Sequence, residues 1–183
     1  VTNSVSACTD TASVNVTRNV SGFAMPPVVG GTLTCANPAI QLQVPGLLGN
    51  HTYQWIGPNG FSSALATPTV SVAGTYSVSV TNVSNGCKGI GNTVVGSNVV
   101  PPTAQAIGGT LPCKTPTLTL NCVTNATNAT FQWSGPNGFS AAVRNPVVNE
   151  QGSYRVTVTN NDGCTKTATA TVQPHVAAPY VFL

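Results

Sequence analysis

The sequence predicts an all-β protein made of two similar antiparallel β-sandwiches. Thr, Ser, Asn, Val and Gly dominate the 183 residues, and this mixture favours strands and turns over helices. Apolar and polar residues alternate in short runs such as 39–44, 75–80, 117–122 and 153–158, which is the period of a half-buried strand. Ala, Leu, Glu and Lys do not recur at helical spacing, so almost no helix is expected.

The composition also limits the function. Charged residues make up 5% of the chain, against about a quarter in typical globular proteins. The net charge of +3 comes from scattered Lys and Arg residues, so no basic patch for nucleic acid is expected. No apolar run is long enough to predict a membrane span. Residues 1–8 lack the basic and apolar regions of a signal peptide, which we expect to be absent or already removed.

A repeat organises the chain. The octapeptide QWIGPNGF (54–61) recurs as QWSGPNGF (132–139), with one residue changed. Other residues recur at nearly the same spacing: Cys35 with Cys113, Trp55 with Trp133, Tyr76 with Tyr154, and Cys87 with Cys164. Self-similarity of this kind indicates copies of a folding unit. We therefore predict two complete repeats, 24–100 and 101–177.

The ends of the chain contain repeat sequence as well. Residues 1–8 match 80–87 and 158–164. The following stretch, "CTDTASVNV" (8–16), matches "CTKTATATV" (164–172). We expect 1–23 to be the last strands of a preceding repeat, and 178–183 to be the start of a following repeat or a tail. The chain would then be a segment of a longer array. Alternatively, the terminal strands belong to these two sandwiches or pair between subunits.

Each repeat is expected to contain about seven short strands. In the first repeat, 39–44 forms the second strand and "YQW" the third, and "GPNG" supplies a turn after it. "TPTVSVAG" forms a short strand that ends at Gly, and 75–80 follows it. "TATATV" forms the last strand of the second repeat. Many short strands separated by turn signals are typical of a β-sandwich.

A tryptophan on the third strand and Gly-x-Tyr at the start of the sixth resemble the immunoglobulin fold. In that family a core cysteine follows Gly-x-Tyr, but Val78 and Val156 occupy its place here. The partner position on the second strand holds Leu42 and Leu120. The resemblance therefore implies tandem Ig-like domains in which aliphatic packing replaces the usual disulfide between the sheets.

The repeated cysteines lie further out, before the second strand and in the turn before the last strand. On the Ig-like arrangement we expect two disulfides within the repeats, Cys35–Cys87 and Cys113–Cys164. Each would close a loop worth about 4 kcal/mol in the chain-entropy model. Disulfides also favour an extracellular location.

Two cysteines remain outside these pairs. Cys8 would pair with a cysteine upstream of this chain. Cys122 lies on the same side of its strand as Leu118 and Leu120, so we expect it to be a buried free thiol.

The pattern of YQW, GPNGFSS, AGTYSVSVTN and NGC also resembles the Ig-like repeats of giant secreted surface proteins of Bacteroidota, including gliding-motility adhesins of the SprB type. The resemblance implies a secreted protein on the bacterial cell surface. It also implies a structural, non-catalytic segment of a fibre, stalk or adhesin, whose partners are neighbouring repeats or like subunits.

Four aromatic residues are candidates for ligand contact. Trp55 and Trp133 could stack on sugar rings, but a core position on the third strand explains their repetition better. Phe61 and Phe139 follow the turn and either pack on the hairpin or form an exposed contact. A glycan-binding adhesin module that contacts surface glycans is therefore one alternative function. A filament subunit assembled by strand exchange between chains is another, and the partial repeats at the chain ends suggest it.

No enzymatic site, metal site or cofactor is expected. His51 and His175 lack repeat counterparts and neighbouring nucleophile motifs. Zinc spacing of cysteines is absent. The acids Asp10, Glu150 and Asp162 stand alone, which argues against calcium. "DTA" resembles the Bacteroidota O-glycosylation motif, which would place a glycan on Thr11.

Overall fold

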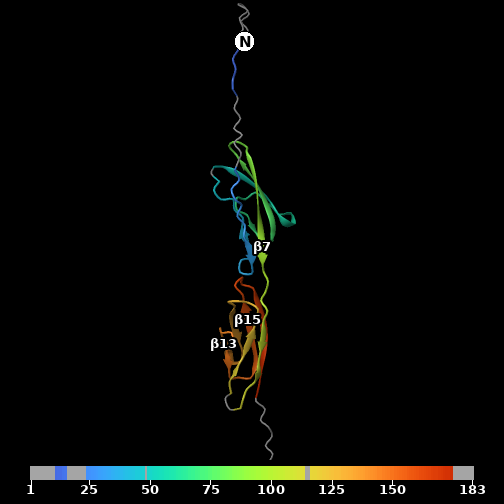
Figure 1. Cartoon of the computed structure of the whole chain (residues 1–183), viewed down its shortest axis with the longest axis vertical. Helices are drawn as coiled ribbons and strands as arrows, with labels where there is room; N and C mark the ends of the chain where they lie inside the picture. Colours follow the sequence, from blue (N-terminus) through green and yellow to red (C-terminus); the bar gives the residue numbers. More distant parts are fainter. Residues whose placement is uncertain (1–10, 16–23, 48, 114–115, 175–183) are drawn as a thin grey trace, which may run out of the picture.

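The protein forms two β-sandwiches stacked end to end along its long axis (Figure 1). The structure is a computed structural model, and it describes residues 11–15, 24–47, 49–113 and 116–174. Strands β1–β7 build the first sandwich and strands β8–β16 build the second. The fold is all-β and Ig-like, as the sequence predicts. The helical content described is two single 3₁₀ turns, η1 (Pro58–Gly60) and η2 (Pro136–Gly138).

The first sandwich has one large and one small sheet. Its strands are β1 (Thr32–Thr34), β2 (Ile40–Gln41), β3 (His51–Ile56), β4 (Ser62–Ser63), β5 (Thr69–Val70), β6 (Gly74–Asn82) and β7 (Lys88–Asn98). The large sheet has the order β1-β7-β6-β3-β4, and β2 pairs with β5 in the small sheet. Strand β1 runs parallel to β7, and the other pairs are antiparallel.

The second sandwich has the same arrangement. Its strands are β8 (Gln105–Ile107), β9 (Gly109–Thr110), β10 (Leu118–Thr119), β11 (Asn121–Val123), β12 (Thr130–Ser134), β13 (Ser140–Ala141), β14 (Val147–Val148), β15 (Gly152–Thr159) and β16 (Thr165–Gln173). The large sheet has the order β13-β12-β15-β16-β9. Strands β8 and β14 pair with β11 and β10 on the other side.

The first strand of each sandwich crosses from one sheet to the other. In the second sandwich, β8 pairs antiparallel with β11, and β9 then pairs parallel with β16. Gly108 lies between them, and a Cβ there would collide with the backbone carbonyl of Thr171. In the first sandwich, a Cβ on Gly30 would lie 2.6 Å from Oγ1 of Thr93. Glycine allows the close backbone approach that this crossing needs.

Each sandwich encloses its own core between the two sheets, and a fully buried tryptophan lies in each. The four aliphatic residues predicted to replace the usual disulfide are also fully buried: Leu42, Val78, Leu120 and Val156. Period-two alternation therefore identified the core side of these strands correctly.

The predicted strands at the two ends of the chain fall mostly outside the described residues. Within 1–23, the structure describes only 11–15, which are exposed and form no strand. Residues 178–183 lie outside the described residues. The expectation that the chain opens and closes with parts of neighbouring repeats therefore remains a prediction.

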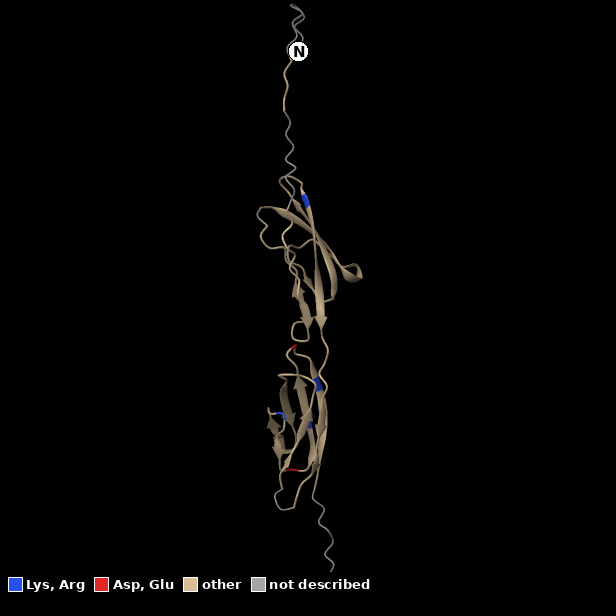
Figure 2. Cartoon of the chain, viewed as in Figure 1, with Lys and Arg blue, Asp and Glu red and all other residues tan. Residues whose placement is uncertain are grey.

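The surface carries few charges: among the described residues, Lys88 lies in the first sandwich and the other charged residues lie in the second (Figure 2). The low charge agrees with a surface made soluble mainly by hydroxyl and amide side chains. No helix in the described ranges is long and apolar enough to cross a membrane.

Candidate functional site

The repeated octapeptide forms a tight hairpin between β3 and β4, and again between β12 and β13. In the first copy, Asn59 has φ 54° and ψ 33°, and Gly60 has φ 73°. The backbone N–H of Phe61 donates to the carbonyl of Pro58 at 3.0 Å. Two successive residues with positive φ define the hairpin turn that Asn-Gly favours. Asn137 repeats this geometry with φ 53° in the second copy.

The hairpin interlocks with the Gly-x-Tyr motif. The Tyr76 ring occupies the space that a Cβ on Gly57 would need. A Cβ on Gly74 would lie 2.6 Å from Cγ of Pro58. The second sandwich repeats both contacts. The two motifs therefore recur together because they build one packed corner, and this corner explains the repetition without a ligand.

The hairpin phenylalanines pack on the cores. Phe61 meets Tyr76 edge to face, with ring centroids 5.4 Å apart. Phe139 meets Tyr154 in the same way at 5.2 Å. Both phenylalanines are half-buried. This arrangement corresponds to the packed hairpin face, the first of the two interpretations that the sequence left open.

The tryptophans are core residues, as predicted. Trp55 and Trp133 have no exposed surface. Their indole Nε1–H groups donate to the carbonyls of Leu65 at 3.0 Å and Val143 at 3.1 Å. A ring buried on both faces offers no surface on which a sugar could stack.

The disulfide found in the structure joins the two sandwiches. Cys35 bonds to Cys164 across 129 positions of sequence, with the Cα atoms 4.9 Å apart. The predicted pairs Cys35–Cys87 and Cys113–Cys164 are therefore wrong. The reason for the Cys35–Cys87 pair is distance. Cys87 precedes the start of β7, whereas Cys35 follows β1, which pairs with the end of β7. The 11 residues of β7 therefore separate the two cysteines by about 35 Å, at about 3.3 Å each. A disulfide needs Cα atoms within about 7 Å.

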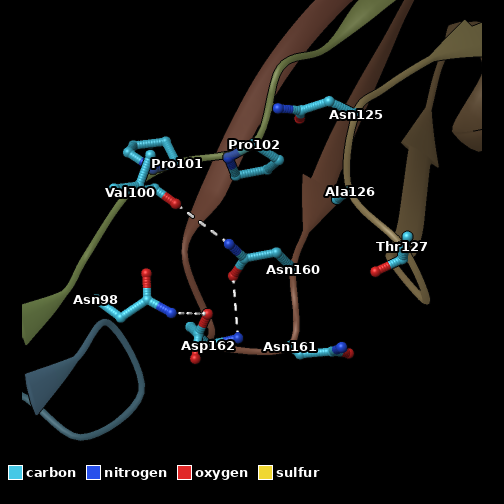
Figure 3. Close-up of a pocket in the computed structure, with 10 residues that line it drawn as sticks. All are labelled: Asn98, Val100, Pro101, Pro102, Asn125, Ala126, Thr127, Asn160, Asn161 and Asp162. Atoms are coloured by element: carbon cyan, nitrogen blue, oxygen red, sulfur yellow. Dashed lines mark hydrogen bonds between the residues drawn. The ribbon is translucent and has the colours of Figure 1, made fainter. Parts of the chain in front are cut away.

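Hydrogen bonds also connect the turn that holds Cys164 to the neighbouring segments, and Figure 3 shows those of Asn160 and Asp162. The N–H of Ala36 donates to the carbonyl of Asp162 at 2.9 Å. The Asn98 side-chain amide donates to Oδ2 of Asp162 at 2.7 Å, and the Asn160 amide donates to the carbonyl of Val100 at 3.2 Å. The turn between β15 and β16 thus contacts both the loop after β1 and the linker between the sandwiches.

The β15–β16 turn is preshaped for this contact. Oδ1 of Asn160 accepts from the N–H of Asp162 at 3.1 Å and from that of Cys164 at 2.9 Å. Gly163 has φ 76°, and a Cβ there would lie 2.7 Å from Cβ of Ala36. Glycine therefore provides both the turn conformation and the room for the neighbouring loop.

The linker is also fixed to the second sandwich. The N–H of Thr103 donates to Oδ1 of Asn125 at 2.8 Å, and the N–H of Asn125 donates back to Oγ1 of Thr103 at 2.9 Å. Pro101 and Pro102 restrict the backbone just before this contact. An open groove of about 270 Å³ lies here, lined mainly by asparagine side chains and the linker. We take this junction as the candidate functional site.

The remaining cysteine and histidine predictions have mixed outcomes. Cys122 is a buried free thiol, as predicted. Burial raises its pKa, and the nearby charge of Arg144 offsets part of that rise. His51 begins β3, with Nδ1 3.1 Å from the Gly49 carbonyl. His175 lies outside the described residues.

The described ranges hold no group of three or more potential metal ligands. Thr11, the predicted glycosylation site, is exposed. Asp10, which begins the motif, lies outside the described residues, so the modification remains a prediction.

Comparisons with known proteins show a structural likeness only. No family model matches the sequence, and no curated protein matches it. Among solved structures, the chain resembles three N-terminal domains of the outer capsid protein Hoc of bacteriophage RB49. The TM-score is 0.54 and the identity 14%, over 82% of this chain and 59% of that one. The chain thus spans less than two thirds of that structure.

Other similar structures contain immunoglobulin domains. The N-terminal four Ig domains of Dscam1 isoform 1.9 align with a TM-score of 0.34 and 13% identity, over 80% of this chain and 43% of that one. A Dpr11 IG1 complex with DIP-gamma aligns at 0.35 and 14%, over 83% and 98%. At such TM-scores and identities these structures carry no argument about this chain.

Proposed function

We propose that the chain is a non-catalytic structural segment of an extracellular array, such as a fibre, a stalk or a surface adhesin. In this proposal 24–100 and 101–177 are the repeat units. Residues 1–23 and 178–183 belong to neighbouring repeats. The segment acts by holding adjacent sandwiches in a fixed relation, so that the array spaces or presents an element elsewhere in the protein.

The observation that carries the proposal is the disulfide between the sandwiches. Cys35 and Cys164 close a loop of 129 residues, worth about 5 kcal/mol in the chain-entropy model. Besides this effect on the unfolded state, the bond adds a second covalent connection beside the linker. Two neighbouring bodies joined at two points bend less than bodies joined by a linker alone.

The location follows from the same bond. Disulfides persist in oxidising environments outside the cytoplasm, so the proposal places the chain on a cell surface or in a secreted protein. The resemblance to Bacteroidota surface repeats supports a bacterial cell surface. O-glycosylation at Thr11 would suit that location.

The packing supports a structural role over glycan binding. Trp55 and Trp133 are buried, while Phe61 and Phe139 are held against tyrosines. A glycan-binding module would need aromatic faces open to solvent. The alternative would be favoured if the unaltered chain bound glycans on an array and a folded Phe139→Ala variant did not.

The test compares the bending of the two sandwiches with and without the disulfide. Small-angle X-ray scattering of the full chain should fit a single extended shape. Cys35→Ser should require an ensemble of bent shapes, with a broader pair-distance distribution. The matched control Cys87→Ser removes a thiol that is free in the structure and should leave the scattering unchanged. Identical scattering from the chain and Cys35→Ser would refute the proposal.

A further inference from the structure

The turn between β6 and β7 (83–87) is built like the β15–β16 turn that forms the junction. In the first sandwich, the N–H of Asn82 donates to the carbonyl of Cys87 at 2.9 Å. In the second, the N–H of Asn160 donates to the carbonyl of Cys164 at 3.0 Å. Cys87 and Cys164 therefore occupy equivalent positions in the hydrogen-bond ladders of the two strand pairs.

Side-chain amides shape both turns. In the β6–β7 turn, Oδ1 of Asn82 accepts from the N–H of Ser84, and Oδ1 of Asn85 accepts from the N–H of Cys87, both at 2.9 Å. In the β15–β16 turn, Asn160 alone accepts both equivalent bonds. Four residues separate Asn82 from Cys87, against three between Asn160 and Cys164, and the second asparagine compensates for the extra residue. The cysteine N–H is anchored in both cases.

The two turns differ in what covers them. Cys164 is 1% exposed and bonded, and Gly163 abuts Ala36 of the preceding sandwich. Cys87 is a half-buried free thiol. Gly86 has φ 69°, and the space that a Cβ would occupy there is open. The β6–β7 turn thus has the same framework as the junction turn, but no residue of the described ranges takes the place of the neighbouring loop.

The position of the β6–β7 turn agrees with a second junction. Strand β7 runs from this turn to the linker, so the turn lies at the end of the first sandwich away from the second (Figure 1). This is the end at which a preceding sandwich would stack, if it were related to the first as the first is to the second.

We propose that the β6–β7 turn binds the loop after the first strand of a preceding Ig-like repeat, and that a cysteine of that loop forms a disulfide with Cys87. The partner loop has the chemistry of Cys35-Ala36: a cysteine followed by a small residue whose N–H is free to donate. Its acceptor is the carbonyl of Asn85, in the place of the Asp162 carbonyl. This inference rests on the proposed function, because it extends the junction into an array stapled at successive repeats.

Formation of the bond needs an oxidant, which is a low-molecular-weight or protein disulfide. One cysteine thiolate attacks the oxidant, forms a mixed disulfide and releases one thiolate. The second cysteine thiolate attacks the protein sulfur of that mixed disulfide, forms the bond between repeats and releases the second thiolate. Two protein thiols are oxidised and one oxidant disulfide is reduced to two thiols, which take up the two protons.

The test supplies the missing neighbour within the full chain. A second copy of 24–100 is inserted after residue 100, with Lys88→Arg in the inserted copy as a mass tag. The extended chain is oxidised with glutathione disulfide, its free thiols are alkylated, and its peptides are mapped without reduction. The expected result is a peptide joining the Cys35 of the first copy to the tagged Cys87, alongside a second Cys35 joined to Cys164.

A matched variant and two outcomes decide the result. Cys87→Ser in the inserted copy should leave one Cys35 alkylated and the bond to Cys164 intact. The inference is overturned if the tagged Cys87 is alkylated, or joined to Cys8, while the bond to Cys164 has formed. Absence of the Cys35–Cys164 bond from the unextended chain would instead overturn the proposed function, so the two failures are distinguishable.

Discussion

The two sandwiches are nearly identical at their hairpins and differ at their β6–β7 and β15–β16 turns. At the hairpins, Asn59 and Asn137 agree within 1° in φ, and both phenylalanines pack edge to face on a tyrosine. At the turns, Cys164 is bonded and buried, whereas Cys87 is a partly exposed thiol. The hairpin completes its contacts within one sandwich, but the turn completes them only with a neighbour.

This difference separates two uses of repeated sequence. Residues repeated inside a sandwich specify the fold, because their partners are repeated with them. Residues repeated at the ends specify the connection, because their partners belong to the next copy. Substitutions at equivalent positions should therefore have equal effects in the hairpins and unequal effects at the ends.

The largest expected effect comes from the buried tryptophans. Trp55→Ala and Trp133→Ala should each lower the free energy of unfolding of their own sandwich by about 3–5 kcal/mol, because each leaves a cavity in a closed core. Chemical denaturation of each variant measures the loss. A loss below about 1 kcal/mol at one position would mean that the two cores are not equivalent. Trp→Phe at each position is the matched control and should cost less.

The interlock between hairpin and tyrosine should give the next largest effect. Gly57→Ala and Gly135→Ala place a methyl group against the rings of Tyr76 and Tyr154, so each should destabilise by about 1–3 kcal/mol through overpacking. Thermal unfolding checks both variants. The exposed neighbour Ser134→Ala is the control and should change stability by no more than about 0.5 kcal/mol. Unaltered stability in either glycine variant would contradict the proposed packing.

Alkaline pH should weaken both sandwiches through the buried tyrosines. Burial raises the pKa of Tyr76 and of Tyr154 above the usual value of 10.0. The folded state therefore favours the neutral phenol, which donates to the carbonyls of Val72 at 2.8 Å and Glu150 at 2.9 Å. This stability is complete below pH 10 and is lost as pH rises through the folded-state pKa.

Denaturation curves from pH 8 to 11.5, with tyrosinate absorbance followed in parallel, test this expectation. Tyr76→Phe combined with Tyr154→Phe should cost about 1 kcal/mol per lost hydrogen bond at pH 8 and should flatten the decline above pH 10. An equally steep decline in the double variant would assign it to other groups.

The smallest effect is expected at the junction side chains. Asp162→Ala removes the carboxylate that accepts from Asn98 but keeps the backbone carbonyl that accepts from Ala36. Because the carboxylate contact is exposed, the loss should be below about 1 kcal/mol. It can be measured as a shift of at most about fivefold in the equilibrium between the Cys35–Cys164 disulfide and glutathione. Asn161→Ala is the control, and a larger shift would show that the carboxylate positions the disulfide.

The sequence was sufficient for the fold because strand alternation and the hairpin turn are local. Val78 and Val156 were placed in the core by strand alternation together with the resemblance to the Ig fold, and Asn59-Gly60 indicated the turn by its chemistry. For Phe61 the sequence allows two positions, because a residue just past a turn can pack inward or project outward. Only the three-dimensional structure shows that Phe61 packs against Tyr76.

The predicted disulfide pairing is wrong because it confines each bond to one repeat, whereas the bond joins two repeats. Strand direction contained a usable signal: Cys35 follows a strand that runs toward the next repeat, whereas Cys87 precedes a strand that starts at the opposite end. Comparing the directions of these two strands would have placed Cys35 and Cys87 at opposite ends of the first sandwich. The polar contacts of Asn98 and Asp162 had no such signal, since neither residue stands out in the repeat.

The disulfide also determines how tension would pass along the molecule. Cys35 and Cys164 close a covalent ring around 36–163, so a pull on the two ends of the chain travels through the sulfur atoms and does not extend the segment between them, which contains both tryptophans. The strands that bear load are β1, before the ring, and β16, after it. Reduction would release the ring as a reserve of about 450 Å of extended polypeptide, at about 3.5 Å per residue. The redox state of the surroundings therefore determines whether this length of chain can be extended under tension.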